Sequence, residues 1–239
     1  MKKARVGTLA SIELLADLPV EEVRALQQKC DWLSYDPDEQ ILDRESDSRD
    51  VYFVVEGRVQ VKNFSFSGRE IALATIGEGG YFGELSAVDQ QPRSASVLAA
   101  ESSMVAALGR DDFIDLIRRY PEVALRVLNR LAQIVRNCDE RIMDLSTLGA
   151  VQRVYVELLR LAKPGPEVSS QWSIDPIPTQ ANVAARASTT RETVARVFSQ
   201  LRKSGLIIRK GKTLYFNDYS ELQSMAERLP HAEGDYVSR

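Results

Sequence analysis

One glycine-rich segment in the first half of the chain combines residue types that can bind a phosphorylated sugar. Gly83-Glu84-Leu85 is followed, ten residues after the glycine, by Arg93-Ser94. Glycine lets the main chain approach a ligand closely, and arginine can bind a phosphate through two parallel N–H groups. The serine hydroxyl adds a donor, while the glutamate suits a ribose hydroxyl and would repel a bare anion. The segment therefore indicates a sugar-phosphate ligand; the alternative is a surface ion pair between Glu84 and Arg93.

A second group of chemically active residues lies in a basic segment near the C-terminus. Residues 177–216 contain eight arginines and lysines and one glutamate, so this segment carries +7 and the rest of the chain −10. Arginine can bond guanine O6 and N7, and a carboxylate can accept from cytosine N4. Arg191, Glu192 and Arg196 therefore predict contacts with DNA bases. The alternative is that Glu192 and Arg196 form a solvated pair, four residues apart on a helix.

Threonines lie directly before these charged residues and between them. Thr190 and Thr193 suit contacts with DNA phosphates near a helix N-terminus, whereas Thr189 and Glu192 also fit a capping box. The complete set of predicted DNA contacts is Thr179, Gln180, Thr190, Arg191, Glu192, Thr193, Arg196 and Lys212.

The elements around this basic segment follow a recognisable order. Periodicity and capping residues predict helices over residues 151–162, 179–187 and 191–204, with a turn at 188–190. A proline-containing loop is expected at 167–178, a hairpin at 206–216 and a short helix at 221–229. Two helices joined by a tight turn and followed by a two-stranded wing describe a winged helix-turn-helix.

The first half of the chain has a different pattern of apolar residues. A helix is expected at residues 20–29. Apolar residues then alternate in short segments near residues 51–55, 59–61, 71–75 and 97, and an apolar run covers 105–108. Glycine-containing turns separate these segments, which predicts a small antiparallel roll or barrel, followed by a helix at 111–119.

A long helix is predicted between these two regions, at residues 122–145. Its apolar positions are spaced 3, 4, 3, 4 and 3 residues apart, which is the repeat of a coiled-coil seam. This spacing favours pairing with a second copy of the chain; the alternative is packing against its own domain. The predicted dimer contacts are Leu128, Leu131, Val135, Cys138, Ile142 and Leu145.

Composition excludes several other classes of protein. Apolar residues make up 44% and charged residues 27%, which is typical of a folded soluble protein. Only two cysteines and one histidine, His231, are present, so a zinc cluster, a four-cysteine iron–sulfur cluster and most histidine-dependent hydrolases are not expected. The chain has neither a stretch of about 20 apolar residues nor a secretory signal. We therefore expect a cytoplasmic, non-membrane protein that is not an enzyme.

These motifs together resemble those of transcription regulators of the catabolite activator (cyclic AMP receptor protein)/FNR family. The resemblance covers about residues 12–216: residues 83–96 resemble the family's phosphate-binding cassette, and residues 190–196 resemble its recognition helix. It implies an α+β fold with an N-terminal β-roll of cyclic-nucleotide-binding type at 1–120 and a long dimerisation helix and hinge at 121–148. A winged helix-turn-helix would follow at 149–217 and a C-terminal extension at 218–239.

The resemblance also implies roles for individual residues. Glu84 would bind the ribose 2′-hydroxyl, Arg93 and Ser94 the cyclic phosphate, and positions on the long helix the purine. The Cys138-Asp139 pair, where cyclic AMP-binding relatives often carry hydroxyl residues, leaves both cyclic AMP and cyclic GMP as candidate effectors. The implied ligand contacts are Val61, Leu73, Ile76, Gly83, Glu84, Leu85, Arg93, Ser94, Asn137, Cys138 and Asp139.

The resemblance further implies partners and excludes prosthetic groups. The cysteine cluster of FNR-type oxygen sensors and the usual haem ligands are absent, so no metal, haem or iron–sulfur cofactor is expected. The implied partners are a palindromic double-stranded DNA site and a second copy of the chain, with RNA polymerase as a further candidate. The alternative is a regulator of the same architecture that is constitutive or senses another anionic metabolite.

Overall fold

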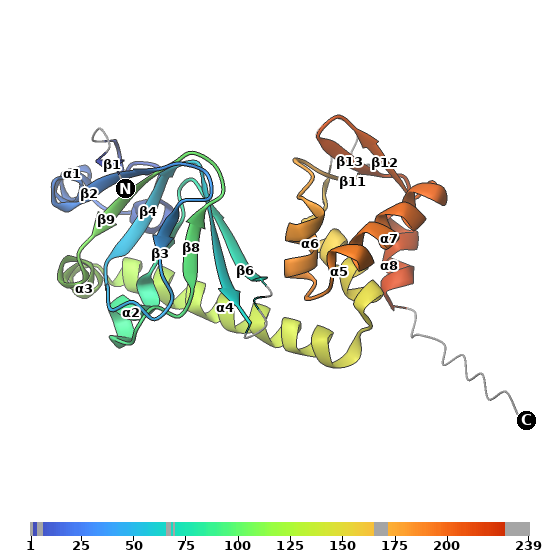
Figure 1. Cartoon of the computed structure of the whole chain (residues 1–239). Helices are drawn as coiled ribbons and strands as arrows, with labels where there is room; N and C mark the ends of the chain where they lie inside the picture. The colour runs from blue at the N-terminus through green and yellow to red at the C-terminus, as the bar shows by residue number, and fades with distance from the viewer. Residues whose placement is uncertain (1, 4–6, 66–67, 69, 165–171, 228–239) are drawn as a thin grey trace, which may run out of the picture. The chain divides into compact units, whose positions relative to one another are not determined.

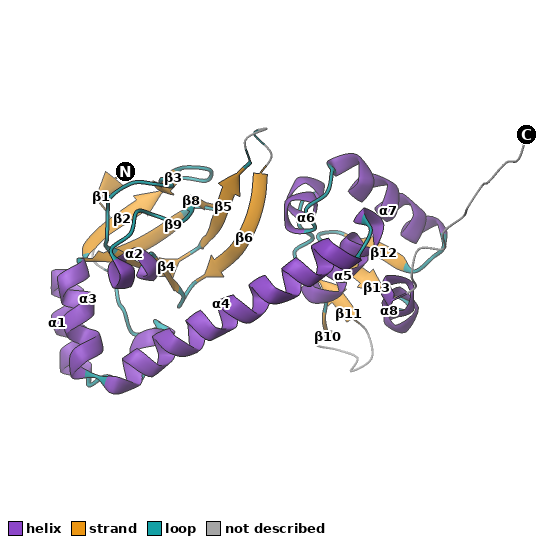
Figure 2. Cartoon of the chain, turned by 90° about the horizontal axis from the view of Figure 1, so that it is seen from below, coloured by secondary structure: helices purple, strands orange, loops and turns teal. Residues whose placement is uncertain are grey.

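The computed structural model describes residues 2–3, 7–65, 68, 70–164 and 172–227. The chain divides into two compact units, Met1–Arg136 and Asn137–Arg239 (Figure 1). The first contains both large sheets and the second contains a cluster of helices with a small sheet (Figure 2). The expected mixture of helices and strands is therefore confirmed.

Two antiparallel sheets form the β-roll of the first unit. One has the strand order β1-β2-β9-β4-β7 and the other the order β3-β8-β5-β6. The strands are β1 (Lys2–Lys3), β2 (Asp31–Tyr35), β3 (Gln40–Leu42), β4 (Val51–Glu56), β5 (Arg58–Phe64), β6 (Glu70–Gly77), β7 (Tyr81–Phe82), β8 (Ser96–Ala99) and β9 (Ser103–Leu108). The alternating segments predicted this roll, but β1, β2, β3 and β7 were not expected.

Strand β4 explains how the first unit is layered. Successive side chains of a strand point to opposite faces of its sheet. Val51, Phe53 and Val55 belong to one apolar cluster, whereas Tyr52 and Val54 belong to another that also contains residues of the second sheet. All five are buried, so this sheet is covered on both faces.

Helices cover the outer face of the five-stranded sheet. They are η1 (Glu13–Leu15), α1 (Val20–Lys29), α3 (Arg110–Arg119) and the first turns of α4 (Pro121–Thr147), while the short α2 (Glu84–Asp89) follows β7. Leu26 of α1, Phe113 and Leu116 of α3 and Val127 of α4 share one buried cluster with the sheet. The helices expected at 20–29 and 111–119 are thus confirmed to within one residue.

Helix α4 is the predicted long helix, and it passes from the first unit into the second. Its first turns bury Val123 and Val127. Most of the predicted seam is instead exposed on the protomer, including Leu128, Val135, Ile142 and Leu145. Leu131 differs, because it is partly buried against the core of the first unit.

The second unit has the predicted helix-turn-helix and wing. Its helices are α5 (Ala150–Leu161), α6 (Gln180–Arg186), α7 (Arg191–Lys203) and α8 (Tyr219–Glu227), and its sheet has the order β10-β11-β13-β12. The strands are β10 (Lys163–Pro164), β11 (Trp172–Ile174), β12 (Ile207–Lys210) and β13 (Thr213–Phe216). The expectation of a loop throughout 167–178 is wrong for Trp172–Ile174, because this segment pairs with β13; residues 165–171 lie outside the described ranges.

Helix α8 lies within the range that we expected to be a C-terminal extension. Leu222 and Ala226 are buried in the core that holds α5, α6 and α7 together. Tyr219 stacks on Trp172 of β11, with ring centroids 4.1 Å apart. The first part of the extension therefore packs as part of the second unit. The predicted helix extended to residue 229, and its last two residues are among those not described.

Candidate functional site

Gly83 begins the predicted phosphate cassette. It precedes α2 with a φ of +88°, in the left-handed region that favours glycine. A Cβ at this position would lie 2.8 Å from Nη1 of Arg93 and 2.8 Å from the main-chain oxygen of Asp50. Both the backbone conformation and the available space therefore require glycine here.

Arg93 is buried directly beside this glycine and is only 3% exposed. Its Nη1 donates to the carbonyl oxygen of Gly83 and its Nη2 to that of Asp50, both at 2.8 Å, while Nε donates to Oγ of Ser48 at 3.0 Å. Burial lowers the pKa of Arg93. A guanidinium has five N–H groups. Within the described part of the chain, these bonds leave two of them for a ligand.

Glu84 is also buried, at 5% exposure. Burial raises its pKa, and the nearby Arg130 acts in the opposite direction. The carboxylate lies 3.7 Å from Nε of Arg130, and no ion pair with Arg93 forms among the residues described. The alternative of a surface ion pair between Glu84 and Arg93 is therefore wrong, since both groups are buried and have other partners.

Arg130 reaches this site from α4 and was not predicted. Its Nη2 donates to the main-chain oxygen of Tyr81 at 2.7 Å, and its guanidinium lies 4.4 Å from the centre of the Tyr81 ring. Nε of Arg130 and the Tyr81 hydroxyl are buried without a hydrogen-bond partner in the described residues. Buried polar atoms of this kind are normally satisfied, so the site has unused donor capacity beside Glu84.

The other predicted ligand contacts in the first unit differ in how far their side chains are buried. Ser94 is exposed, and its carbonyl oxygen accepts from Nδ2 of Asn63 at 3.1 Å. Val61 and Ile76 belong to the apolar cluster between the sheets. Leu73, however, is 48% exposed, and Leu85 on α2 also faces solvent.

The three predicted base contacts lie on α4 beyond Arg136, in the second unit. Asn137, Cys138 and Asp139 are all exposed. Their role in binding the purine stays a prediction.

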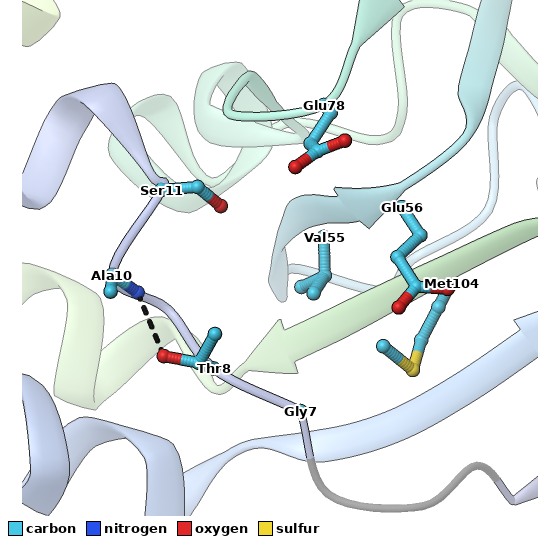
Figure 3. A pocket seen from close by; sticks show the side chains of 8 residues that line it. All are labelled: Gly7, Thr8, Ala10, Ser11, Val55, Glu56, Glu78 and Met104. Carbon is cyan, nitrogen blue, oxygen red and sulfur yellow. Dashed lines mark hydrogen bonds between the residues drawn. The ribbon is translucent and has the colours of Figure 1, made fainter.

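A separate hollow of about 590 Å³ lies in the first unit (Figure 3), and no residue of the predicted cassette lines it. The carboxylates of Glu56 and Glu78 stand at its edge, which disfavours an anionic ligand. Its lining residues are Gly7, Thr8, Ala10, Ser11, Val55, Glu56, Glu78 and Met104, none of which was a predicted contact.

The start of α7 differs in one detail from the sequence-based expectation. Thr190, rather than Thr189, is the N-cap, and its Oγ1 accepts from the main-chain N–H of Thr193 at 3.2 Å. Thr189 is buried in the turn. The capping box expected from Thr189 and Glu192 is therefore replaced by a cap at Thr190.

The charged residues of α7 point away from its core. Val194, Val197, Phe198 and Leu201 are buried, whereas Arg191, Glu192 and Arg196 are exposed. No ion pair joins Glu192 to Arg196 in the described structure, so both side chains are available to a ligand. Of the remaining predicted contacts, Thr179 caps α6, Gln180 follows it, and Lys212 is exposed between β12 and β13.

This arrangement matches a known pair of domains. The cyclic nucleotide-binding domain matches residues 32–120, and the Crp-like helix-turn-helix domain matches residues 152–225. The chain is 37% identical, over 66% of its length and 70% of the relative's, to the cyclic AMP receptor protein of Thermus thermophilus. It belongs to the cyclic AMP receptor protein/FNR family of transcription regulators.

Solved structures of the family agree with this assignment. The catabolite activator protein of Thermus thermophilus is 31% identical, with a TM-score of 0.51, and the match covers 89% of this chain and 97% of that one. The c-di-GMP responsive global regulator CLP of Xanthomonas campestris shares the fold at 19% identity, with a TM-score of 0.66 and coverage of 83% and 99%. The motifs found in the sequence thus identified the family correctly.

Neither a metal-binding cluster nor a membrane-spanning helix occurs in the described ranges. No cluster of three or more histidine, cysteine, aspartate or glutamate side chains that could hold a metal ion occurs among them. None of the helices in these ranges has the length and apolar character needed to cross a lipid bilayer.

Proposed function

We propose that this family member is a cyclic-nucleotide-responsive transcription regulator that binds a palindromic DNA site as a homodimer. The observation that carries the proposal is the buried guanidinium of Arg93, fixed by main-chain oxygens beside Gly83. A cation desolvated in this way binds an anionic phosphate more strongly than an exposed arginine would. Glu84, buried nearby, would accept from the ribose 2′-hydroxyl.

Cyclic AMP and cyclic GMP are the two candidate effectors. The printed name of the Thermus thermophilus relative, cyclic AMP receptor protein, supports cyclic AMP. The carboxylate of Asp139 could accept from an adenine amino group or from the N–H groups of guanine. The second candidate function is a regulator of the same fold that senses another anion, which is favoured by the c-di-GMP responsive relative.

Helix α4 would transmit ligand binding because it contributes Arg130 to the candidate site. Arg130 lies on α4 and faces Glu84 at 3.7 Å. A ribose hydroxyl bound by Glu84 would change the surroundings of Arg130 and hence the preferred position of the helix. A ligand shifts such an equilibrium only by its difference in affinity between the two states, so several kcal/mol of preference are needed.

The dimer would place two copies of α7 on one face of DNA. The exposed seam of α4 supplies the contact, and the recognition helices must lie about 34 Å apart to enter successive major grooves. Arg191, Glu192 and Arg196 would contact bases, while Thr190 and Thr193 would contact phosphates. We expect the protein to act in the cytoplasm, without enzymatic activity, and RNA polymerase is a candidate partner.

Titration calorimetry with cyclic AMP, cyclic GMP and c-di-GMP tests the proposal directly. We expect one of the two cyclic mononucleotides to bind, and Arg93→Leu to weaken that binding by about 100-fold or more, as loss of two charge-assisted hydrogen bonds allows. The matched control is Arg49→Leu, because Arg49 is exposed in the loop that holds Ser48 and Asp50. Thermal unfolding checks that both variants fold.

Two results would contradict the proposal. The first is unchanged affinity in a folded Arg93→Leu variant, which would remove the phosphate from this site. The second is binding of c-di-GMP alone, which would favour the alternative effector.

A further inference from the structure

Two arginines hold the turn of the helix-turn-helix from outside the motif. Arg153, on α5, donates from Nε to the carbonyl oxygen of Ala187 at 3.0 Å and from Nη2 to that of Ser188 at 3.1 Å. Its Nη1 donates at 2.7 Å to the carbonyl oxygen of Leu148, between α4 and α5. One guanidinium therefore ties this turn to the corner where α4 ends.

Arg141 makes the second connection, and it comes from α4 itself. Its Nη2 lies 3.3 Å from the carbonyl oxygen of Ala185 and 3.2 Å from Oγ of Ser188, and donates to both. The side chain is partly buried, and this burial lowers its pKa. Partial desolvation of a cation is costly unless its hydrogen bonds are made, so these bonds specify where the turn lies.

The turn itself has a conformation that needs support. Ser188 has a φ of +48°, in the left-handed region that costs a residue with a side chain about 1 kcal/mol or more. The next residue, Thr189, donates its main-chain N–H to Ala184 at 2.9 Å, and Thr190 then caps α7. The direction in which α7 begins, and so the position of Arg191 and Glu192, follows from this turn.

The last turns of α4 are also tied to α5. Arg160 of α5 bonds Asp144 at 2.6 Å and lies 3.5 Å from Glu140. The end of α4, the start of α5 and the turn before α7 are thus connected by side chains within the second unit.

We propose that Arg141 is a positioning residue through which the end of α4 sets the orientation of the recognition helix. The proposal depends on the proposed function in one respect, namely that α7 is the helix that enters the DNA groove. A displacement of the end of α4 is then passed to the turn by Arg141, in addition to passing along the main chain through α5.

Hydrogen–deuterium exchange of the free protein tests the connection without DNA or effector. We expect Arg141→Met to raise deuterium uptake about tenfold or more in peptides covering residues 184–193, as the loss of its two hydrogen bonds to this turn allows. The control is Arg136→Met, because Arg136 is exposed on the same helix and the substitution removes the same charge. This control leaves uptake in residues 184–193 unchanged.

A second variant distinguishes loss of the hydrogen bond between Arg141 and Ser188 from a general loss of stability. Ser188→Gly removes the hydroxyl acceptor, and glycine adopts a positive φ without strain. We expect Ser188→Gly to raise deuterium uptake in the same peptides. In the double variant with Arg141→Met, the increase in uptake should be smaller than the product of the two single increases, because the two residues interact. Uptake that is unchanged in Arg141→Met, or that rises equally throughout the second unit, overturns the proposal.

Binding to DNA gives an independent measurement. In Arg141→Met we expect the affinity for the specific DNA site to fall about tenfold, because the recognition helix is no longer held in position. The affinity for non-specific DNA and the salt dependence of binding stay as in the wild type. Equal weakening on all sequences with a smaller salt slope would make Arg141 a phosphate contact and overturn the proposal. If the wild type itself binds no specific site, the proposed function fails, and the exchange experiment still decides the role of Arg141.

Discussion

Replacing Ile142 by alanine gives a quantitative test of the dimer seam. Ile142 is 60% exposed on the protomer. Full burial of such a side chain contributes about 1.5–3 kcal/mol, so burying this fraction contributes about 1–2 kcal/mol per copy. In the proposed symmetric dimer two copies of this side chain would be buried, and alanine retains a small part of the gain. We therefore expect a loss of about 2–3 kcal/mol, which raises the dimer Kd about 30- to 150-fold.

The matched control for this substitution lies next to it. Met143 is also 60% exposed, but it falls outside the seven-residue repeat and on the outer face of α4. Sedimentation velocity over a wide concentration range measures the dimer Kd of the wild type, Ile142→Ala and Met143→Ala. The seam is refuted if Ile142→Ala dimerises like the wild type, or if Met143→Ala weakens the dimer equally.

The same seam can be tested covalently. Cys138 is exposed at a seam position, whereas Cys30 is buried and burial raises its pKa to about 12. Thiolates are the reactive form, so Cys30 reacts slowly. A parallel dimer in register brings each Cys138 opposite its copy, and mild oxidation then yields a crosslinked dimer that Cys138→Ser lacks. An uncrosslinked product from a dimeric protein would indicate another register or another interface.

Two further predictions concern the DNA and ligand sites. Arg196→Ala costs about 1–3 kcal/mol in specific DNA binding and relaxes preference at one base pair, as measured by competition with single-substituted sites; uniform weakening on every sequence would assign Arg196 to phosphate alone. The raised pKa of Glu84 means that the native protein binds this proton more tightly than the unfolded chain, so its contribution to the free energy of unfolding decreases as pH rises above 4.5. Urea titrations at several pH values measure the unfolding free energy of the wild type minus that of Glu84→Gln. This difference therefore falls as the pH rises above 4.5, and a flat difference would contradict the raised pKa.

The predicted elements that were confirmed carry strong local signals. The helix at 20–29, the long helix and the helix-turn-helix show helical periodicity with capping or breaking residues at their ends. The roll was predicted from strands separated by glycine-containing turns. Strand β2 was missed because both of its faces are buried: Trp32 packs on one side and Leu33 and Tyr35 on the other, so polar residues do not alternate with apolar ones.

The site could be predicted only where its residues are close in the sequence. Gly83, Glu84 and Arg93 lie within one short segment, and the structure brings them together. Arg130 is distant in sequence, and no motif connected it with the cassette. Its position seven residues after the buried Val123 was an available signal, because it places a charge on the side of the helix that faces the roll.

The packing of α8 sets the shortest piece of the second unit that can be studied alone. Leu222 and Ala226 fill the surface of α5 and its neighbours, so a fragment cut after the wing, at Phe216, would expose that apolar surface to water. Such a fragment would tend to aggregate, and its weak DNA binding would be mistaken for a property of the wing. Expression boundaries for this half should therefore extend at least to Glu227.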